Sequence, residues 1–280
     1  MTAPAPAVPR LVPAARGFAW LSQAFVLLRA QTARLLLLAL VMQLILGLSQ
    51  VPLLGLLIVL SVPGLTAGLL EAFHLTGQGG RPSLRVLFVP LTSGAHAGRL
   101  LGMGALVFAV GVVCVSAMLS GSSELADPAV LERIEQGDIE AMAALNQESL
   151  GRMALAFLVG IGVSGTLSYF TVPLIWFRDR KLLDGLGTGL KALLLNWRPF
   201  LVLGLGLLLL FLPVAILSGL LFSLVASGGL GSAVVMGLIM VLLLLFQMML
   251  FGTQYCAFRD IFGIPSTAVA APEDDSQLVA

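Results

Sequence analysis

The chain has 280 residues, of which 59% are hydrophobic and only 10% are charged. Since soluble domains carry roughly 25% charged residues, this composition excludes a water-soluble globular protein and points to a lipid environment. The formal net charge of +1 says little about function, because in a membrane protein the distribution of charge matters more than its total. We expect no nucleic-acid partner. Cys114 and Cys256 both lie in apolar runs, so they predict neither a disulfide framework nor a C-x-x-C metal pair.

The predicted elements begin with a Pro/Ala-rich segment, residues 1–14, which lacks the apolar core of a signal peptide and is interpreted as a disordered cytoplasmic tail. An integral membrane domain follows over residues 15–260, and a second cytoplasmic tail over 261–280. A spanning helix needs about 20 residues. The uncharged runs predict six spans, at about 35–48, 51–70, 100–119, 153–177, 199–225 and 233–257. The predicted fold class is therefore an all-α, six-span transmembrane helical bundle.

Residues 120–151 between the third and fourth spans form an acidic loop, predicted to lie outside the cell. Asp127-Pro128 favours a helix start, and Gly137-Asp138 favours the end of that helix and the start of another. The second helix would place Ile139, Met142 and Leu145 toward the protein. The spacing of a calcium-binding loop is absent.

Basic residues set the expected orientation. Twelve of the fifteen Lys and Arg residues lie before span one, between spans two and three, or between spans four and five. Cytoplasmic loops carry the excess of Lys and Arg. The pattern therefore predicts a bacterial inner-membrane protein with both termini in the cytoplasm.

Each odd-numbered span follows a semi-polar segment that ends in Arg: 17–34, 82–99 and 182–198. Their apolar side chains recur at helical spacing: Phe18, Leu21, Phe25 and Leu28; Leu84, Leu87 and Val89; and Leu183, Leu186, Leu190, Leu193 and Trp197. This pattern indicates amphipathic interfacial helices and suggests three repeats of interfacial helix plus hairpin. The expected partners are the bilayer and its anionic lipid headgroups, contacted by Arg16, Arg29, Arg34, Arg85, Arg99, Lys191 and Arg198.

Glycines within or near the spans indicate helix packing. Gly160, Gly162 and Gly165 match G-x-G-x-x-G, but a dinucleotide site needs a preceding strand. Small residues in a span instead let helices approach closely. The G-x-x-x-G pairs Gly64/Gly68, Gly98/Gly102 and Gly185/Gly189 have the same interpretation.

No catalytic, cofactor-binding or metal-binding residues are predicted. Ser164 lacks the second glycine of G-x-S-x-G, and His74 and His96 lie outside the spans. Glu71 and His74 form one E-x-x-H pair, whereas a di-iron bundle uses two such pairs and two further carboxylates. We therefore expect a protein that is not an enzyme.

Three prolines, Pro63, Pro173 and Pro213, interrupt predicted spans. They are explained either by kinks that neighbouring helices satisfy or by broken helices around a substrate site. Ion-coupled transporters keep charged residues inside the bundle. The centres of these spans are uncharged, which argues against a proton-driven pump.

The segment Val12-Pro13-Ala14-Ala15-Arg16-Gly17-Phe18-Ala19-Trp20-Leu21 resembles the V-P-A-x-R-G-x-x-W-L opening of an uncharacterised family of proteobacterial inner-membrane proteins. Val51–Gly55 and Asn196–Phe200 also look like that family. The layout is more distantly similar to the membrane domain fused to some glycerophosphodiester phosphodiesterases, whose catalytic barrel this chain lacks. The resemblance implies fold and location, with no transferable activity.

Two functions follow as hypotheses. The first is a non-enzymatic membrane protein that organises, senses or scaffolds through its basic interfacial helices. The alternative is a transporter or permease-like protein for a small solute or lipid. A protein partner is not identifiable from the sequence, and a homo-oligomer is left open.

Overall fold

A computed structural model describes residues 8–51, 54–119, 127–136, 138, 147–225 and 230–264. The long helices in this part of the chain are α2 (Thr32–Gly47), α3 (Leu54–Gly77), α5 (Gly94–Leu119), α8 (Gln147–Arg178), α10 (Trp197–Val225) and α11 (Leu230–Phe262). The shorter helices are α1 (Arg16–Ala30), η1 (Leu48–Gln50), η2 (Leu84–Leu87), α4 (Val89–Thr92), α6 (Pro128–Glu135) and α9 (Leu182–Leu195).

Six helices are long and apolar enough to cross a membrane, which confirms the predicted all-α, six-span bundle. They cover Thr32–Gln50, Leu54–Gly77, Gly94–Ala117, Leu150–Arg178, Trp197–Ser223 and Gly231–Phe262. The third spanning helix, α5, begins at Gly94, six residues before the predicted start at residue 100. The sixth, α11, continues beyond the predicted end at residue 257 to Phe262. The protein is therefore a multi-pass membrane protein.

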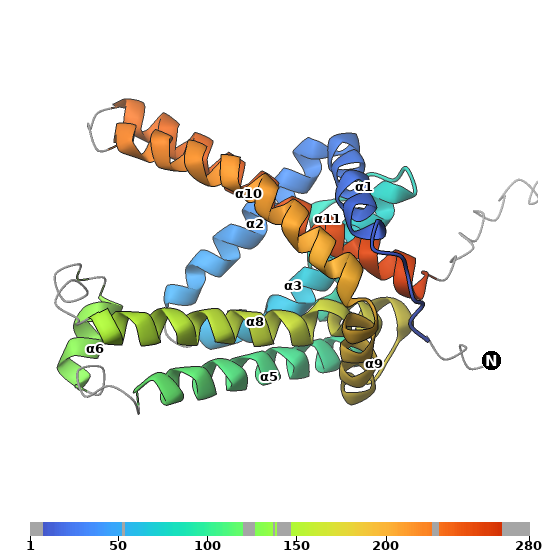
Figure 1. Ribbon diagram of the computed structural model, residues 1–280, viewed down its shortest axis with the longest axis horizontal. Helices are drawn as coiled ribbons and strands as arrows, with labels where there is room; N and C mark the ends of the chain where they lie inside the picture. The colour runs from blue at the N-terminus through green and yellow to red at the C-terminus, as the bar shows by residue number, and fades with distance from the viewer. Residues whose placement is uncertain are drawn as a thin grey trace, which may run out of the picture.

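The long helices form three hairpins, α2–α3, α5–α8 and α10–α11, whose paired members pack against each other. We call the end where α3, α8 and α11 finish and α2, α5 and α10 begin the basic end, because it carries the predicted basic segments. The other end is called the open end. In Figure 1, α1 and α9 cross the long helices at the basic end, whereas α6 lies at the open end.

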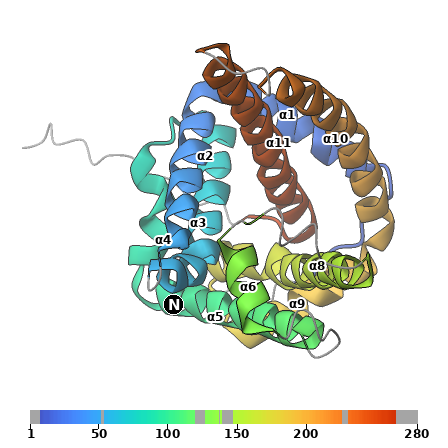
Figure 2. The same ribbon diagram turned by 90° about the vertical axis from the view of Figure 1, so that its left-hand side faces the viewer.

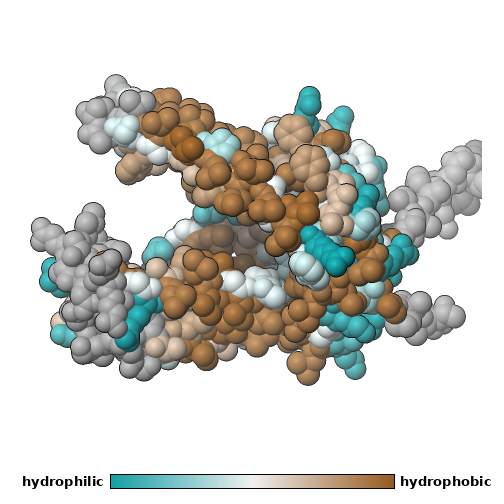
Figure 3. Space-filling model, in the orientation of Figure 1, coloured by the Kyte–Doolittle hydropathy of each residue, from teal (hydrophilic) through white to brown (hydrophobic). Residues whose placement is uncertain are grey.

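Tight packing is concentrated at the basic end. Phe170, Phe258 and Phe262 form its aromatic centre, with Phe170 and Phe262 rings 5.3 Å apart. Phe200 brings α10 against Phe170 of α8 at 5.6 Å. Toward the open end the α10–α11 hairpin diverges from the α5–α8 hairpin (Figure 1), and Figure 3 shows an apolar notch between them. Figure 2 shows the hairpins from the open end, arranged around the bundle.

Helix α1 is present as predicted, and part of its surface packs on the bundle. Gly17, Trp20, Ala24 and Leu28 are buried, whereas the predicted apolar-face residue Phe18 is 65% exposed. In lipid a large apolar side chain loses little by facing outward, and small residues allow close helix contact. The packed face of α1 therefore combines Gly17 and Ala24 with Trp20 and Leu28, of which Leu28 belongs to the predicted apolar spacing.

Helix α9 follows the same rule. Gly185, Gly189 and Ala192 are buried, while Leu183 is 80% exposed and Leu190 is 43% exposed. Its large apolar side chains are thus left to face the surroundings.

The middle segment is not the single interfacial helix that the sequence predicted. It consists of η2 and α4, and it ends at Gly94, where φ is +45°. Pro90 lies in the first turn of α4, where its missing backbone N–H leaves no helical hydrogen bond unmade. Gly94 adopts a left-handed conformation that glycine accepts readily. Arg99 consequently lies in α5 rather than at the end of a separate helix.

The three short segments close the bundle in a cyclic order. α1 packs on α10 and α11, η2 and α4 pack on α3, and α9 packs on α8. Each short segment therefore lies on the hairpin that precedes it, with α1 closing onto the last one. This arrangement supports the predicted repeat of short segment plus hairpin at the level of packing.

A glycine sits at each of these three contacts. A methyl group at Gly17 would lie 2.8 Å from the backbone nitrogen of Leu203, and one at Gly68 would lie 2.6 Å from Cα of Leu87. At Gly189 it would lie 3.1 Å from Cβ of Phe170. The first two approaches admit no side chain without a backbone shift, and the third requires Phe170 to give way.

The predicted glycine motifs differ in their surroundings. Gly64/Gly68 and Gly185/Gly189 lie against neighbouring segments, as expected. Gly98, Gly162 and Gly165 have open space where a Cβ would be, so their packing interpretation is wrong for the described chain.

The acidic loop and the prolines are partly described. Asp127 caps α6 by accepting a hydrogen bond from the Ala129 backbone nitrogen at 2.9 Å, as predicted. The second loop helix, with Ile139, Met142 and Leu145, lies outside the described residues. Pro63, Pro173 and Pro213 lie inside the continuous helices α3, α8 and α10, so these helices are not broken.

Replacing Gly68 with Ala should lower the free energy of unfolding by about 2 kcal/mol, because the new methyl group overlaps the Leu87 backbone. Gly237→Ala in α11 is the matched control, since no atom lies within 4 Å of that position. There Ala should be neutral or should stabilise the helix by up to about 1 kcal/mol. Denaturant titration in mixed micelles measures both changes. A similar loss in both variants would contradict the contact as the cause.

Candidate functional site

The structure brings the segments with the seven predicted headgroup-contact residues to the basic end. They occupy α1, the first turn of α2, η2, α5, α9 and the first turn of α10: Arg16, Arg29, Arg34, Arg85, Arg99, Lys191 and Arg198. Figure 3 shows hydrophilic side chains gathered at this end of the molecule. The seven residues divide into two groups by their contacts.

Five of the seven are exposed, and we call them the basic rim: Arg29, Arg34, Arg85, Lys191 and Arg198. The guanidinium of Arg29 lies 5.7 Å from the ring centroid of Phe25, and that of Arg198 lies 5.5 Å from the ring of Trp197. Both rings are more than half exposed. A cation stacked on an exposed aromatic ring suits the boundary between lipid tails and headgroups.

Arg16 has a structural contact in addition. Its Nε atom lies 2.7 Å from Oδ2 of Asp260, and the same oxygen accepts a 2.9 Å hydrogen bond from Nε1 of Trp20. This ion pair joins α1 to α11. The Asp260 carboxylate raises the pKa of Arg16 above its usual value, chiefly through the hydrogen bond.

Arg99 is likewise engaged within the protein. Its Nη1 atom lies 2.5 Å from Oδ1 of Asp179 and donates to the Asp179 carbonyl at 3.0 Å. His96 lies 3.2 Å from the same carboxylate oxygen. Asp179 has φ of +51°, so a non-glycine residue holds a left-handed turn between α8 and α9. Arg99 and His96 thus fasten α5 to this turn.

Asn196 and the segment before α1 form a contact that the sequence did not predict. The buried Asn196 side chain accepts from the Val12 backbone nitrogen at 2.9 Å and donates to the Arg10 carbonyl at 3.1 Å. The Arg10 backbone nitrogen donates to the Ile261 carbonyl at 3.0 Å. Residues 10–12, assigned to a disordered tail from sequence, are therefore held against α11 and the α9–α10 turn.

Glu71 and His74 point to separate partners rather than to a shared metal position. Trp176 donates to Glu71 at 2.9 Å, whereas His74 contacts the Tyr255 hydroxyl at 3.1 Å and Gln78 at 3.0 Å. Among the residues whose positions are described, no group of three or more His, Cys, Asp or Glu could hold a metal ion. These polar groups join α3 to α8 and α11.

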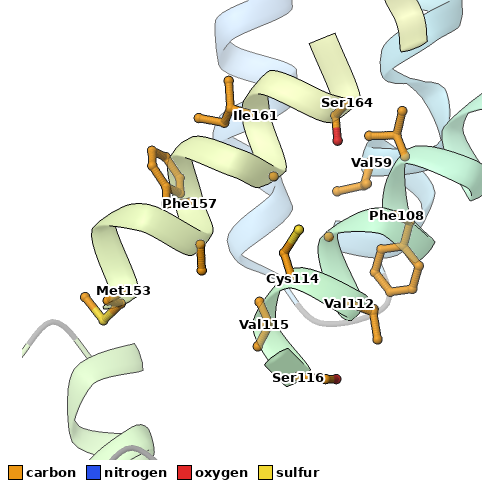
Figure 4. Close-up of a pocket in the computed structure, with 14 residues that line it drawn as sticks. Val59, Phe108, Val112, Cys114, Val115, Ser116, Met153, Phe157, Ile161 and Ser164 are labelled. Carbon is orange, nitrogen blue, oxygen red and sulfur yellow. The ribbon is translucent and has the colours of Figure 1, made fainter. Parts of the chain in front are cut away.

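A groove of about 850 Å³ lies between α5 and α8 toward the open end, with Val59 of α3 as part of its wall. Figure 4 shows Cys114 on α5 and Ser164 on α8 facing the space between the two helices. Gly111 and Gly160 widen it, and the remaining lining is mainly Val, Phe, Ile, Met and Ala. The described lining residues include no Asp, Glu or His, so Ser164 has no general base in the groove. The groove suits an apolar occupant.

No protein-family profile, curated protein or solved structure matches this chain. The resemblance to the proteobacterial family and the expectation that the protein is not an enzyme consequently stay predictions.

Asn196→Ala should release the segment before α1. Loss of the two hydrogen bonds to residues 10 and 12 is worth about 2 kcal/mol, which corresponds to about a thirtyfold rise in local opening. Limited trypsin digestion in micelles should show this rise at the Arg10–Leu11 bond. Asp127→Ala, which removes the cap of α6 at the open end, is the control and should leave cleavage at this bond unchanged. Equal cleavage rates in the wild type and the Asn196 variant would contradict the role of Asn196.

Proposed function

We propose that this protein is a non-enzymatic membrane-organising or scaffolding protein of a bacterial inner membrane, with both termini in the cytoplasm. The basic rim would bind anionic lipid headgroups of the cytoplasmic leaflet. The proposal depends above all on one observation: Arg29, Arg34, Arg85, Lys191 and Arg198 are exposed on segments that meet at one end of the bundle. The resemblance to proteobacterial inner-membrane proteins agrees with this location.

Electrostatics support this orientation. The cytoplasmic leaflet is negatively charged, and a Lys or Arg near its surface contributes about 1 kcal/mol. Large apolar side chains of α1 and α9 face away from the bundle at the same end, including Phe18 and Leu183. Basic and apolar side chains side by side match the headgroup layer and the lipid tails beneath it.

A scaffolding role also agrees with the distribution of polar contacts. Arg16, Arg99 and Asn196 are engaged in bonds that hold separate segments of the chain together at the basic end. These bonds hold α1 and both ends of α9 in place, so the part of the basic rim on α1, α9 and the start of α10 is preorganised.

The alternative is a transporter or permease-like protein for a small solute or lipid, and the groove between α5 and α8 favours it. Its apolar lining suits a lipid tail better than an ion. The groove also lies near the apolar notch between the α5–α8 and α10–α11 hairpins, which Figure 3 shows. A lipid tail could therefore reach it from the membrane.

Arg85→Gln combined with Lys191→Gln should weaken the preference for anionic lipid by up to about thirtyfold, because two charges near the surface contribute up to about 2 kcal/mol. The ratio of phosphatidylglycerol to phosphatidylethanolamine retained by the purified protein measures this change. Arg133→Gln combined with Arg152→Gln, near the open end, is the matched control and should leave the ratio unchanged.

Reporter fusions give the orientation on which the lipid measurement depends. Residue 140 should report outside, and residues 90, 190 and 270 should report inside. A cytoplasmic signal at residue 140, or an unchanged lipid ratio in the Arg85/Lys191 variant, would overturn the proposed function.

Transport and scaffolding are separated by flux measurements in liposomes. Scaffolding predicts no transbilayer movement of fluorescent phospholipid or of small solutes above protein-free vesicles. Robust lipid flux that Gly111→Leu reduces at least about fivefold, by filling the groove, would favour the transporter. Gly219→Leu in α10, where no atom lies within 4 Å, is the control and should leave flux unchanged.

A further inference from the structure

The chain leaves α11 between two arginines. Arg178 donates from Nη2 to the carbonyls of Phe262 and Gly263, and the Arg10 backbone nitrogen donates to the Ile261 carbonyl. Gly263 has φ of +68°, a left-handed conformation that commonly ends a helix. The side chain of Arg178 and the backbone of Arg10 therefore lie against the end of α11.

Further positive charge lies next to this turn. Arg10 and Arg180 are close enough to Arg178 to repel its charge, and Lys181 follows directly in the chain and is exposed. Arg180 is paired with Asp184 at 2.6 Å. In the described ranges, no carboxylate lies within 4.0 Å of the Arg10, Arg178 or Lys181 cationic groups. We call Arg10, Arg178, Arg180 and Lys181 the exit cluster.

The sequence that follows α11 has the opposite charge. Residues 265–280 contain Glu273, Asp274 and Asp275 and no Lys or Arg. Glu273 follows Ile264 after eight intervening residues, so the first carboxylate cannot lie farther than about 30 Å from the end of the described chain. Tethering at such a length keeps the acidic residues at an effective concentration in the millimolar range around the exit cluster.

We propose that the acidic segment Glu273–Asp275 binds the exit cluster of its own chain. Three consecutive carboxylates face a group of cations that repel one another, so the contact relieves like-charge repulsion on both sides. The docking does not depend on the proposed function. The consequence of docking does rest on the proposed function: the docked segment competes with anionic headgroups for the cationic surface of the basic end.

The chain contains two lysines, Lys181 in the exit cluster and Lys191 two to three helical turns further along α9. A zero-length carbodiimide cross-link joins a carboxylate to an amine only when the two are in direct contact. In dilute full-length protein in neutral micelles, peptides with Glu273–Asp275 should be linked to Lys181 at least about fivefold more often than to Lys191. Raising the salt from 0.05 M to 0.5 M should reduce the yield several-fold, because the charges are exposed and screened.

Two variants show whether the exit cluster is responsible. Arg10→Gln should lower the Lys181 cross-link at least about fivefold, because its side chain is exposed and its hydrogen bonds use the backbone. Arg85→Gln, also exposed at the basic end but outside the exit cluster, should leave the yield unchanged. Equal linkage to Lys181 and Lys191, or equal loss in both variants, would overturn the proposal.

Other occupants give different results. A mixture of isotopically heavy and light protein shows whether links join two chains, and links that are solely between chains would assign the exit cluster to a second copy and overturn docking within one chain. Phosphatidylglycerol in the micelle should lower the intramolecular link relative to phosphatidylcholine. An intramolecular link that phosphatidylglycerol leaves unchanged would establish docking while overturning competition with lipid, and the Arg85/Lys191 lipid ratio independently reports on the proposed function.

Discussion

Within a bilayer, burying apolar surface between helices gains little, because lipid tails are as apolar as the side chains they replace. Helices then associate through close van der Waals contact and hydrogen bonds, and both are concentrated at the basic end of this bundle. Gly17, Gly68 and Gly189 let short segments approach the hairpins at backbone distance. The rest of the architecture depends on those contacts, since the hairpins diverge toward the other end (Figure 1).

Polar bonds reinforce the same end for a related reason. A hydrogen bond or ion pair is stronger where water is scarce, and an unpaired polar group is correspondingly costly there. The Asp260 carboxylate accepts hydrogen bonds from both Arg16 and Trp20. The Asn196 side chain forms hydrogen bonds with three backbone groups in two segments. These contacts join the beginning of the chain to its last helix, so the cyclic arrangement is closed by polar groups as well as by glycines.

Basic residues that look alike in the sequence have different roles, because some are paired within the protein and others are exposed. Arg16 and Arg99 each face a carboxylate on another segment, whereas Arg85 and Lys191 are exposed beside apolar side chains. The first pair positions the segments, and the second pair is available to headgroups or to any anionic group that comes near. The proposed scaffolding surface and the exit cluster are therefore two parts of one cationic end, held in place by the residues that are already paired.

The sequence by itself determined the six crossings, because an uncharged apolar run of sufficient length has few alternatives to spanning the bilayer. It also determined that the basic segments meet at one end, since each of them connects an even crossing to an odd one or precedes the first. The cap of α6 followed from Asp127-Pro128 alone, because the contact is local.

Only the tertiary structure decided which faces pack and which cations are free. In α1 and α9 the spacing of the large apolar residues did not show which side packs on the bundle, because lipid accepts Phe18 and Leu183 as readily as the core does. Asn196 and Arg10 are 186 residues apart in the chain, and Arg16 and Asp260 are 244 apart. No local sequence pattern predicts contacts between residues so far apart in the chain. The groove between α5 and α8 is of the same kind, because its lining residues come from separate helices and meet only in the folded chain.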